Sequence, residues 1–301
     1  MKAKITGFLD HDKNLSIEEQ IDLAEKHQLD TLCIRFNQHK DIFEVDEKQI
    51  KHISDLLKDH KMKVSIIDPE IKPYKMDNQN HHEEALDQFR YALKIANKVK
   101  ATHIYLRLFK FNDIIDEYPN VEKRLEDYVN LANKAGKKII LYPTSDYKLN
   151  TYTYIFKKYK SNVLSILFDP VHIMTQDQSN TTNYRLLKKH IAAFACHDAT
   201  KDGIPKLLGY GKADVVSLFK KLMRDNYKGF LLIDNQFYKE IFEETPKPKG
   251  LKALFQSKQN KQKESQRTEI SKVIFPNEET KNATYDDILD NQIKLLNMLF
   301  K

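Results

Sequence analysis

The chain has 301 residues, of which 41% are hydrophobic, and its 50 basic and 43 acidic residues leave a formal net charge of +7. No apolar run approaches the roughly 20 residues that a membrane span requires, and the first residues contain no apolar stretch like that of a signal peptide. Both cysteines, Cys33 and Cys196, lie in apolar, strand-like runs, which suits reduced packing residues. These features predict a soluble, cytoplasmic protein with no membrane partner.

Short apolar runs alternate with longer amphipathic ones along the whole chain. Strands are expected at residues 4–8, 31–36, 63–67, 102–108, 138–142, 163–168, 191–196 and 229–233. A capping box at Ser16 opens the first helix, and further helices are expected at 47–60, 82–100, 121–135, 152–159, 183–190, 213–226 and 284–300. Eight strand and helix pairs in strict alternation predict an α/β fold, a (β/α)8 TIM barrel that forms one domain over residues 1–301.

Residues 238–283 form an insertion between the last strand and the last helix. Proline, lysine and glutamine dominate it and aromatic residues are scarce, so it is expected to bury too little apolar surface to become ordered. A flexible segment is therefore predicted, with an active-site lid as the alternative. Its basic stretch, 247–263, contains no acidic residue, and we interpret it as a solvated loop rather than a phosphate-binding patch. Nucleic acid is not an expected partner.

Polar residues at the carboxyl ends of barrel strands converge on one site. In this chain those positions hold Arg35, Asn37, Asp68, Glu70, Arg107, Tyr142, Thr144, Asp169, His172, His197, Asp198, Asp234 and Asn235. Asp169 and His172 follow an apolar strand in FDPVH, where the carboxylate can serve as a ligand or base and the imidazole can contact substrate hydroxyls. The alternative is that Asp169 caps the turn that follows.

The polar residues at the remaining strand ends also allow more than one interpretation. His197 and Asp198 are adjacent, so only one of them can face the barrel axis in an extended strand. Asp234 ends an apolar strand and is expected to be a pocket carboxylate rather than a loop cap. Arg35 and Arg107 interrupt apolar strands, where an unpaired guanidinium would be costly. Either they pair with carboxylates such as Asp68 or Glu70, or they bind an anionic ligand.

The stretches FDPVHIM, CHDATKDG, LLGYGKADVVSLFKKL and NYKGFLLID resemble the second half of the xylose isomerase-like sugar phosphate isomerases and epimerases. That resemblance implies a TIM barrel with one divalent metal held by Glu, Asp, His and Glu. It also implies that carboxylates move protons at a carbon next to a carbonyl, while the cation polarises that carbonyl. The related endonuclease IV branch has a richer set of metal ligands, which this chain lacks.

The resemblance assigns metal positions to the ends of four strands. Tyr142 stands where the first Glu belongs and cannot supply a carboxylate. Asp169 retains the second ligand, and Asp234 replaces the last Glu with a shorter side chain. At the third position the preferred alignment places Ala195, and an alternative alignment places His197. The implied metal ligands are therefore Asp169, His197 and Asp234, which would hold Mg²⁺ or Mn²⁺ weakly.

The leading hypothesis is a sugar phosphate isomerase- or epimerase-like protein that binds a small, anionic carbohydrate at the carboxyl ends of the strands. As an enzyme it would use Asp234 as base and either Tyr142 or Asp198 as acid. The expected substrate-binding residues are His172, Arg35, Arg107, Asp68 and Asp198. The alternative is a catalytically inactive barrel that serves as a ligand sensor or an interaction protein.

Overall fold

The structure, a computed structural model, describes residues 3–11, 15–37, 40–233, 237–243, 251–278 and 280–300. Parallel strands form one eight-stranded sheet in the order β1-β12-β9-β8-β7-β6-β5-β2. An isolated bridge between Phe8 and Cys33 joins the two end strands. The strands are β1 (Lys4–Gly7), β2 (Thr31–Ile34), β5 (Lys63–Ile67), β6 (His103–Leu106), β7 (Lys138–Leu141), β8 (Leu164–Phe168), β9 (Ile191–Ala195) and β12 (Phe230–Ile233). The predicted TIM barrel is confirmed.

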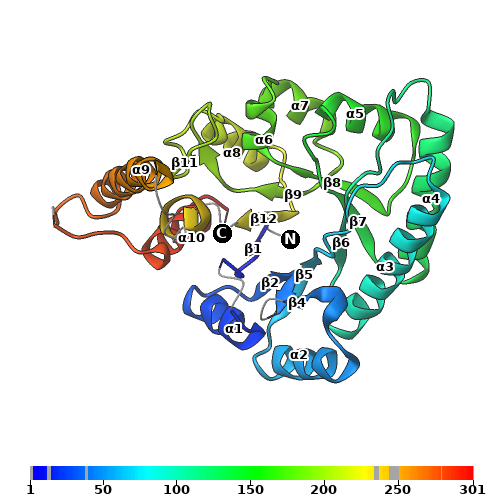
Figure 1. Cartoon of the computed structure of the whole chain (residues 1–301), viewed down its shortest axis with the longest axis horizontal. Helices are drawn as coiled ribbons and strands as arrows, with labels where there is room; N and C mark the ends of the chain where they lie inside the picture. The colour runs from blue at the N-terminus through cyan, green and yellow to red at the C-terminus, as the bar shows by residue number, and fades with distance from the viewer. Residues whose placement is uncertain are drawn as a thin grey trace.

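Helices cover the outside of the strands, as Figure 1 shows. They are α1 (Ile17–Lys26), α2 (Glu47–Asp59), α3 (Gln79–Lys98), α4 (Tyr118–Lys134), α5 (Leu149–Lys158), α6 (Pro170–Thr175), α7 (Asn180–Leu187), α8 (Val215–Arg224), α9 (Leu251–Ile274) and α10 (Tyr285–Phe300). Short elements near the barrel end are β3 (Phe36–Asn37), β4 (Lys40–Asp41), η1 (Ile42–Glu44), β10 (Asp198–Ala199), β11 (Pro205–Lys206) and η2 (Tyr238–Phe242). In the described part of the chain, no helix is long and apolar enough to cross a membrane.

The first helix begins where the sequence predicts. The Ser16 side chain accepts a hydrogen bond from the Glu19 amide, and the Glu19 carboxylate accepts one from the Ser16 amide. Buried Ile17, Ile21 and Ala24 then turn one face of α1 towards the barrel. The other surface helices bury one face in the same way, so the helices and the outward side chains of the strands share one apolar layer.

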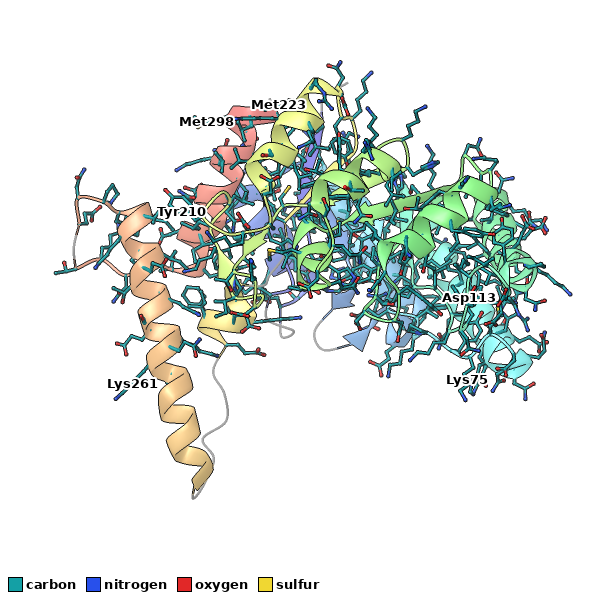
Figure 2. All side chains as sticks on the ribbon, turned by 90° about the horizontal axis from the view of Figure 1, so that it is seen from above. Lys75, Asp113, Tyr210, Met223, Lys261 and Met298 are labelled. Atoms are coloured by element: carbon teal, nitrogen blue, oxygen red, sulfur yellow. The ribbon has the colours of Figure 1, made fainter. Side chains whose placement is uncertain are left out.

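The insertion differs from the prediction, because residues 251–274 form helix α9 rather than an irregular segment. Figures 1 and 2 show α9 beside α10, with its amino-terminal half extending beyond the rest of the molecule. Its carboxyl-terminal turns are attached through buried Ile270 and Ser271, and Lys206 forms an ion pair with Glu269 2.6 Å away. The composition of the insertion indicated too little apolar surface to order it. The contacts of Ile270, Ser271 and Glu269 nevertheless attach the carboxyl-terminal end of α9 to the barrel.

Inside the barrel, a separate apolar cluster fills the space between the strands. Its buried members are Phe8, Cys33, Ile66, Tyr105, Ile140, Leu167, Ala193, Ala195 and Leu232. Below this layer, at the amino end of β6, the half-buried ring of His103 packs edge-on against Phe230 with 5.1 Å between ring centroids. Burial, assisted by the positive charges of Lys138 and Lys4, lowers the pKa of His103 from 6.5 to about 4.

We expect acidification to destabilise the fold through His103. Between pH 6.5 and about 4 the unfolded imidazole binds a proton that the folded one does not, so stability is complete above this window and falls within it. Because the side chain is only half-buried, the loss should be about 1 to 2 kcal/mol. Urea unfolding at several pH values should show a flatter profile for His103→Asn than for the wild type. Parallel profiles would rule this contribution out.

Candidate functional site

The two-residue period of the strands places one polar side chain per strand directly above the interior cluster. Counting two residues onward from Phe8, Cys33, Ile66, Tyr105, Ile140, Leu167 and Ala195 leads to the carboxyl end of the barrel. The residues reached are Asp10, Arg35, Asp68, Arg107, Tyr142, Asp169 and His197, and we call them the rim ring. The same step from Leu232 leads to Asp234, which lies outside the described residues.

Two arginine–carboxylate pairs occupy one half of the rim ring. Arg35 donates from Nε and Nη2 to the two oxygens of Asp10 at 2.7 and 3.0 Å, and Arg107 donates from Nη1 and Nη2 to those of Asp68 at 2.7 and 2.9 Å. The carboxylates are only 2% and 1% exposed, and the arginine side chains 16% and 15%. Pairing was one of the two alternatives for these arginines, and it makes their burial tolerable.

Each guanidinium also lies over an aromatic ring of the barrel. Arg35 is 4.5 Å from the ring centroid of Phe8, and Arg107 is 4.6 Å from that of Tyr142. Tyr142 in turn packs edge-on against buried Tyr105, with 5.3 Å between their centroids. These contacts fix both guanidinium planes, since each is held at one edge by a carboxylate and at one face by a ring.

Asp169 and His197 form the opposite half of the rim ring. His197 Nε2 lies 2.7 Å from Asp169 Oδ1, and the same oxygen accepts a hydrogen bond from the His172 amide at 2.8 Å. The same carboxylate oxygen of Asp169 therefore caps the amino end of α6 and contacts His197. Burial acts to raise the pKa of Asp169, but His197 and the His172 amide outweigh it, so this pKa lies below its ordinary value.

His172 lies beside this pair, at the start of α6. Its imidazole forms a hydrogen bond with the backbone of Thr144, and burial lowers its pKa despite the nearby Asp169 charge. The ring is therefore neutral at pH 7. Its Nε2 is buried and has no hydrogen-bond partner in the described structure, so one nitrogen remains as a potential hydrogen-bond acceptor at the barrel end.

The register at the end of β9 differs from the preferred alignment. Ala195 and His197 point the same way, with Ala195 in the interior cluster and His197 one layer above it in the rim ring. The alternative alignment, which placed His197 at the implied ligand position, is therefore the one that the geometry supports. The preferred alignment relied on the spacing to the following loop, whereas strand alternation puts Ala195 one layer below the rim ring.

Asp198 points away from the barrel axis, as expected for the neighbour of an inward His197. Its carboxylate is 1% exposed and accepts backbone hydrogen bonds from Ala199, Gly209, Gly211 and Ala213 at 2.9 to 3.1 Å. Gly211 lies so close that a Cβ placed there would be 2.1 Å from Asp198 Oδ1. The expected substrate contact has no support in this geometry, because the carboxylate is used to hold the loop.

Asp10 was missed in the sequence, although it completes one of the two ion pairs. It lies in the loop after β1, three residues beyond the last strand residue, and no motif marks it. The signal that could have found it is the two-residue step from the inward Phe8. The sequence already indicated that Arg35 needs a carboxylate partner, because burying an unpaired guanidinium is costly.

Two carboxylates of the described rim ring are already paired with arginines and are not open to a divalent metal. Asp10 and Asp68 are each held by two arginine hydrogen bonds, and Tyr142 offers only a phenol. Asp169 and His197 are the two remaining side chains of the kind that bind metals. Catalytic zinc sites use about three protein ligands, and the third implied ligand, Asp234, lies outside the described residues.

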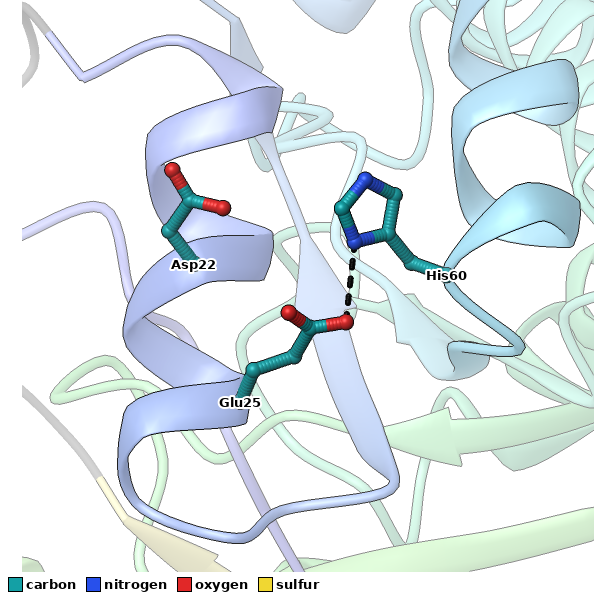
Figure 3. Close-up of side chains that lie close together, drawn as sticks. All are labelled: Asp22, Glu25 and His60. Carbon is teal, nitrogen blue, oxygen red and sulfur yellow. Dashed lines mark hydrogen bonds and ion pairs between the residues drawn. The ribbon is translucent and has the colours of Figure 1, made fainter.

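One cluster of possible metal-ligating side chains exists elsewhere in the described part of the chain. The candidate ligand atoms of Asp22, Glu25 and His60 all lie within 4.8 Å of one another. Figure 3 shows Asp22 and Glu25 on α1 facing His60 at the end of α2, with 2.8 Å between Glu25 Oε1 and His60 Nδ1. All three are exposed, and because helices of a barrel run back to the amino ends of the strands, this cluster is remote from the rim ring.

A sequence model of the xylose isomerase-like TIM barrel family matches residues 21–256. The chain therefore belongs to this family. A search of curated proteins found no match.

Solved structures share the fold at low sequence identity. The IOLI protein with a bound zinc atom is 15% identical, with a TM-score of 0.65 over 90% of this chain and 99% of that one. D-psicose 3-epimerase from Clostridium cellulolyticum, solved with D-tagatose, is 12% identical, with a TM-score of 0.64 over 98% and 96%. The probable 3-DHS dehydratase AsbF from Bacillus anthracis is 13% identical, with a TM-score of 0.65 over 99% of both chains. These likenesses establish the fold alone.

We expect Asp198→Ala to destabilise the protein by about 3 kcal/mol, because four backbone amides, two in buried and two in part-buried hydrogen bonds, would lose their acceptor. Asp202→Ala, in the exposed turn nearby, is the matched control and should change stability by less than about 0.5 kcal/mol. Urea midpoints of the two variants provide the comparison. Equal midpoints would show that Asp198 has no structural role.

Proposed function

We propose that this chain binds a small carbohydrate at the carboxyl end of its barrel, with the rim ring as the binding surface. The observation that supports the proposal is the convergence of seven described polar side chains, each from a different strand, onto this end. Sugars present hydroxyl and carbonyl groups in several directions, and a ring that offers both donors and acceptors suits them. Family membership and neighbours named as epimerases are consistent with this ligand class.

The charge balance of the rim ring indicates whether the proposed ligand is charged or neutral. An anionic sugar was expected because two arginines seemed available for it. Both are already neutralised, Arg35 by Asp10 and Arg107 by Asp68, so the described ring has no surplus positive charge. An incoming phosphate would have to compete with buried carboxylates. We therefore propose an uncharged polyhydroxy carbonyl compound as the ligand.

His172 is the proposed contact for a ligand hydroxyl. Its unpartnered, buried Nε2 accepts a hydrogen bond in the neutral tautomer, and its other contact, to the Thr144 backbone, fixes the ring. A hydroxyl donor from a sugar would satisfy an acceptor that otherwise lacks a partner. This assignment agrees with the substrate-binding role that the family resemblance implies for the position.

The second candidate is a barrel that binds its sugar without converting it. Tyr142 favours this version, because it stands where the resemblance implies a catalytic carboxylate. Proton NMR of the bound sugar in D₂O separates the two. Loss of the signal from the hydrogen next to the carbonyl supports an isomerase or epimerase with Tyr142 and Asp234 as acid and base. A retained signal in a sugar that binds supports the ligand sensor.

We expect unphosphorylated ketoses and aldoses to bind the wild type in isothermal titration calorimetry, and their phosphorylated counterparts to bind more weakly. His172→Phe keeps a ring of similar size but removes the acceptor, so affinity should fall about tenfold. The matched control is His52→Phe, an exposed histidine on α2 that pairs with Glu18, and its affinity should equal that of the wild type. Absence of binding by the whole panel would refute the proposed function.

A further inference from the structure

We propose that Asp22, Glu25 and His60 form a binding site for a divalent transition metal, best suited to Zn²⁺, that links the carboxyl ends of helices α1 and α2. The cluster lies at the amino end of the barrel, opposite the rim ring, so the inference is independent of the proposed function. It is supported by the geometry of the three side chains, by the charges around them and by the kinds of atoms that they offer.

Two helix ends bring the three side chains together. Asp22 and Glu25 stand at positions i and i+3 of α1, so they lie on the same face of that helix. His60 directly follows the last residue of α2, and its amide donates to the Leu56 carbonyl at 3.0 Å, which fixes the backbone that carries the imidazole. Figure 3 shows both carboxylates on the side of α1 that faces this imidazole. Three possible ligands from two helices therefore converge.

The spacing of the ligand atoms suits a metal ion. One nitrogen or oxygen atom of each side chain lies within 4.8 Å of the other two, and Glu25 Oε1 is 2.8 Å from His60 Nδ1. Around a tetrahedral zinc ion with bonds of about 2.0–2.2 Å, neighbouring ligand atoms lie roughly 3.4 Å apart. Because all three side chains are exposed, rotations that move these atoms by about 1 Å reach that spacing without a change in the backbone.

The charges around the cluster favour a cation. Glu25 lies in the last turn of α1, where the partial negative charge of the helix end opposes an acidic side chain, and Lys26 of the same turn pairs with Asp286 instead. In the described part of the chain, the Asp22 carboxylate has no hydrogen bond or ion pair, and the Glu25 carboxylate has one, to His60. His60 itself lies at the negative end of α2. A bound divalent ion would neutralise both carboxylates.

The atoms that the cluster offers determine which metal fits. One imidazole nitrogen and two carboxylate oxygens match zinc sites with three protein ligands and a water, whereas Mg²⁺ and Ca²⁺ prefer oxygen ligands alone. A second histidine–glutamate pair joins the same two helices, with 2.9 Å between His52 Nε2 and Glu18 Oε1. Among the described residues that pair has no third ligating side chain, so it provides an internal control.

Calorimetric titration of the full chain with Zn²⁺ tests the site. We expect His60→Ala to bind one equivalent of zinc fewer than the wild type, and Asp22→Asn to bind that equivalent at least about tenfold more weakly. His52→Ala is the matched control and should bind zinc as the wild type does. Because each variant is compared with the wild type, zinc held elsewhere in the chain does not affect the difference. An unchanged stoichiometry in His60→Ala, or an equal loss in His52→Ala, would overturn the inference.

Amide hydrogen exchange locates the bound ion. The turns that end the two helices are closed by backbone hydrogen bonds from Gln28 to Glu25 at 2.9 Å and from Lys61 to Lys58 at 3.1 Å. We expect Zn²⁺ to slow exchange at residues 27–29 and 60–62 in the wild type and in His52→Ala, but not in His60→Ala. The same concentration of Mg²⁺ should leave these rates unchanged. Zinc-dependent slowing confined to other segments would place the ion elsewhere and overturn the inference.

Discussion

Burying arginine at the end of an apolar strand is tolerable only where a carboxylate meets it, and this constraint organises the carboxyl end of the barrel. Asp10 and Asp68 are almost fully buried, and each accepts two hydrogen bonds from one guanidinium. Removal of one partner would leave an uncompensated charge, whereas the complete pair is stable. The pairs also orient both guanidinium planes, so the rim has a defined pattern of donors before any ligand arrives.

The same pairing divides the described rim carboxylates into two kinds. Asp10 and Asp68 are paired with cations that belong to the chain, whereas Asp169 contacts His197. Tyr142 fits this arrangement because an aromatic ring can accept the face of Arg107. Tyr142, Arg107 and Asp68 therefore form one connected set of contacts at the rim.

The fold followed from the sequence because each strand is a short apolar run and each helix has an amphipathic period. The rim was only partly predictable. Arg107 and Asp68 stood at recognisable strand ends, but Asp10 lies in a loop whose inward direction depends on the strand before it. Asp198 was assigned to substrate because a carboxylate beside His197 looks functional, and only the structure shows its four backbone donors. Helix α9 was not predicted because the composition of the whole insertion is polar and hides the few residues near its carboxyl end, such as Ile270, that are buried.

The closure of the barrel has a mechanical consequence. Around most of the sheet, neighbouring strands are joined by a continuous backbone ladder, but β1 and β2 meet through an isolated bridge at Phe8 and Cys33. Side chains strengthen this seam: Thr6 donates to the Thr31 carbonyl at 3.3 Å, and the Asp10–Arg35 pair spans the same two strands at the rim. The sheet is thus closed into a barrel at β1 and β2 by one backbone bridge and these side-chain contacts. At this seam the barrel therefore depends on side-chain contacts in addition to the backbone bridge, and the charged pair at the rim contributes to closing the cylinder.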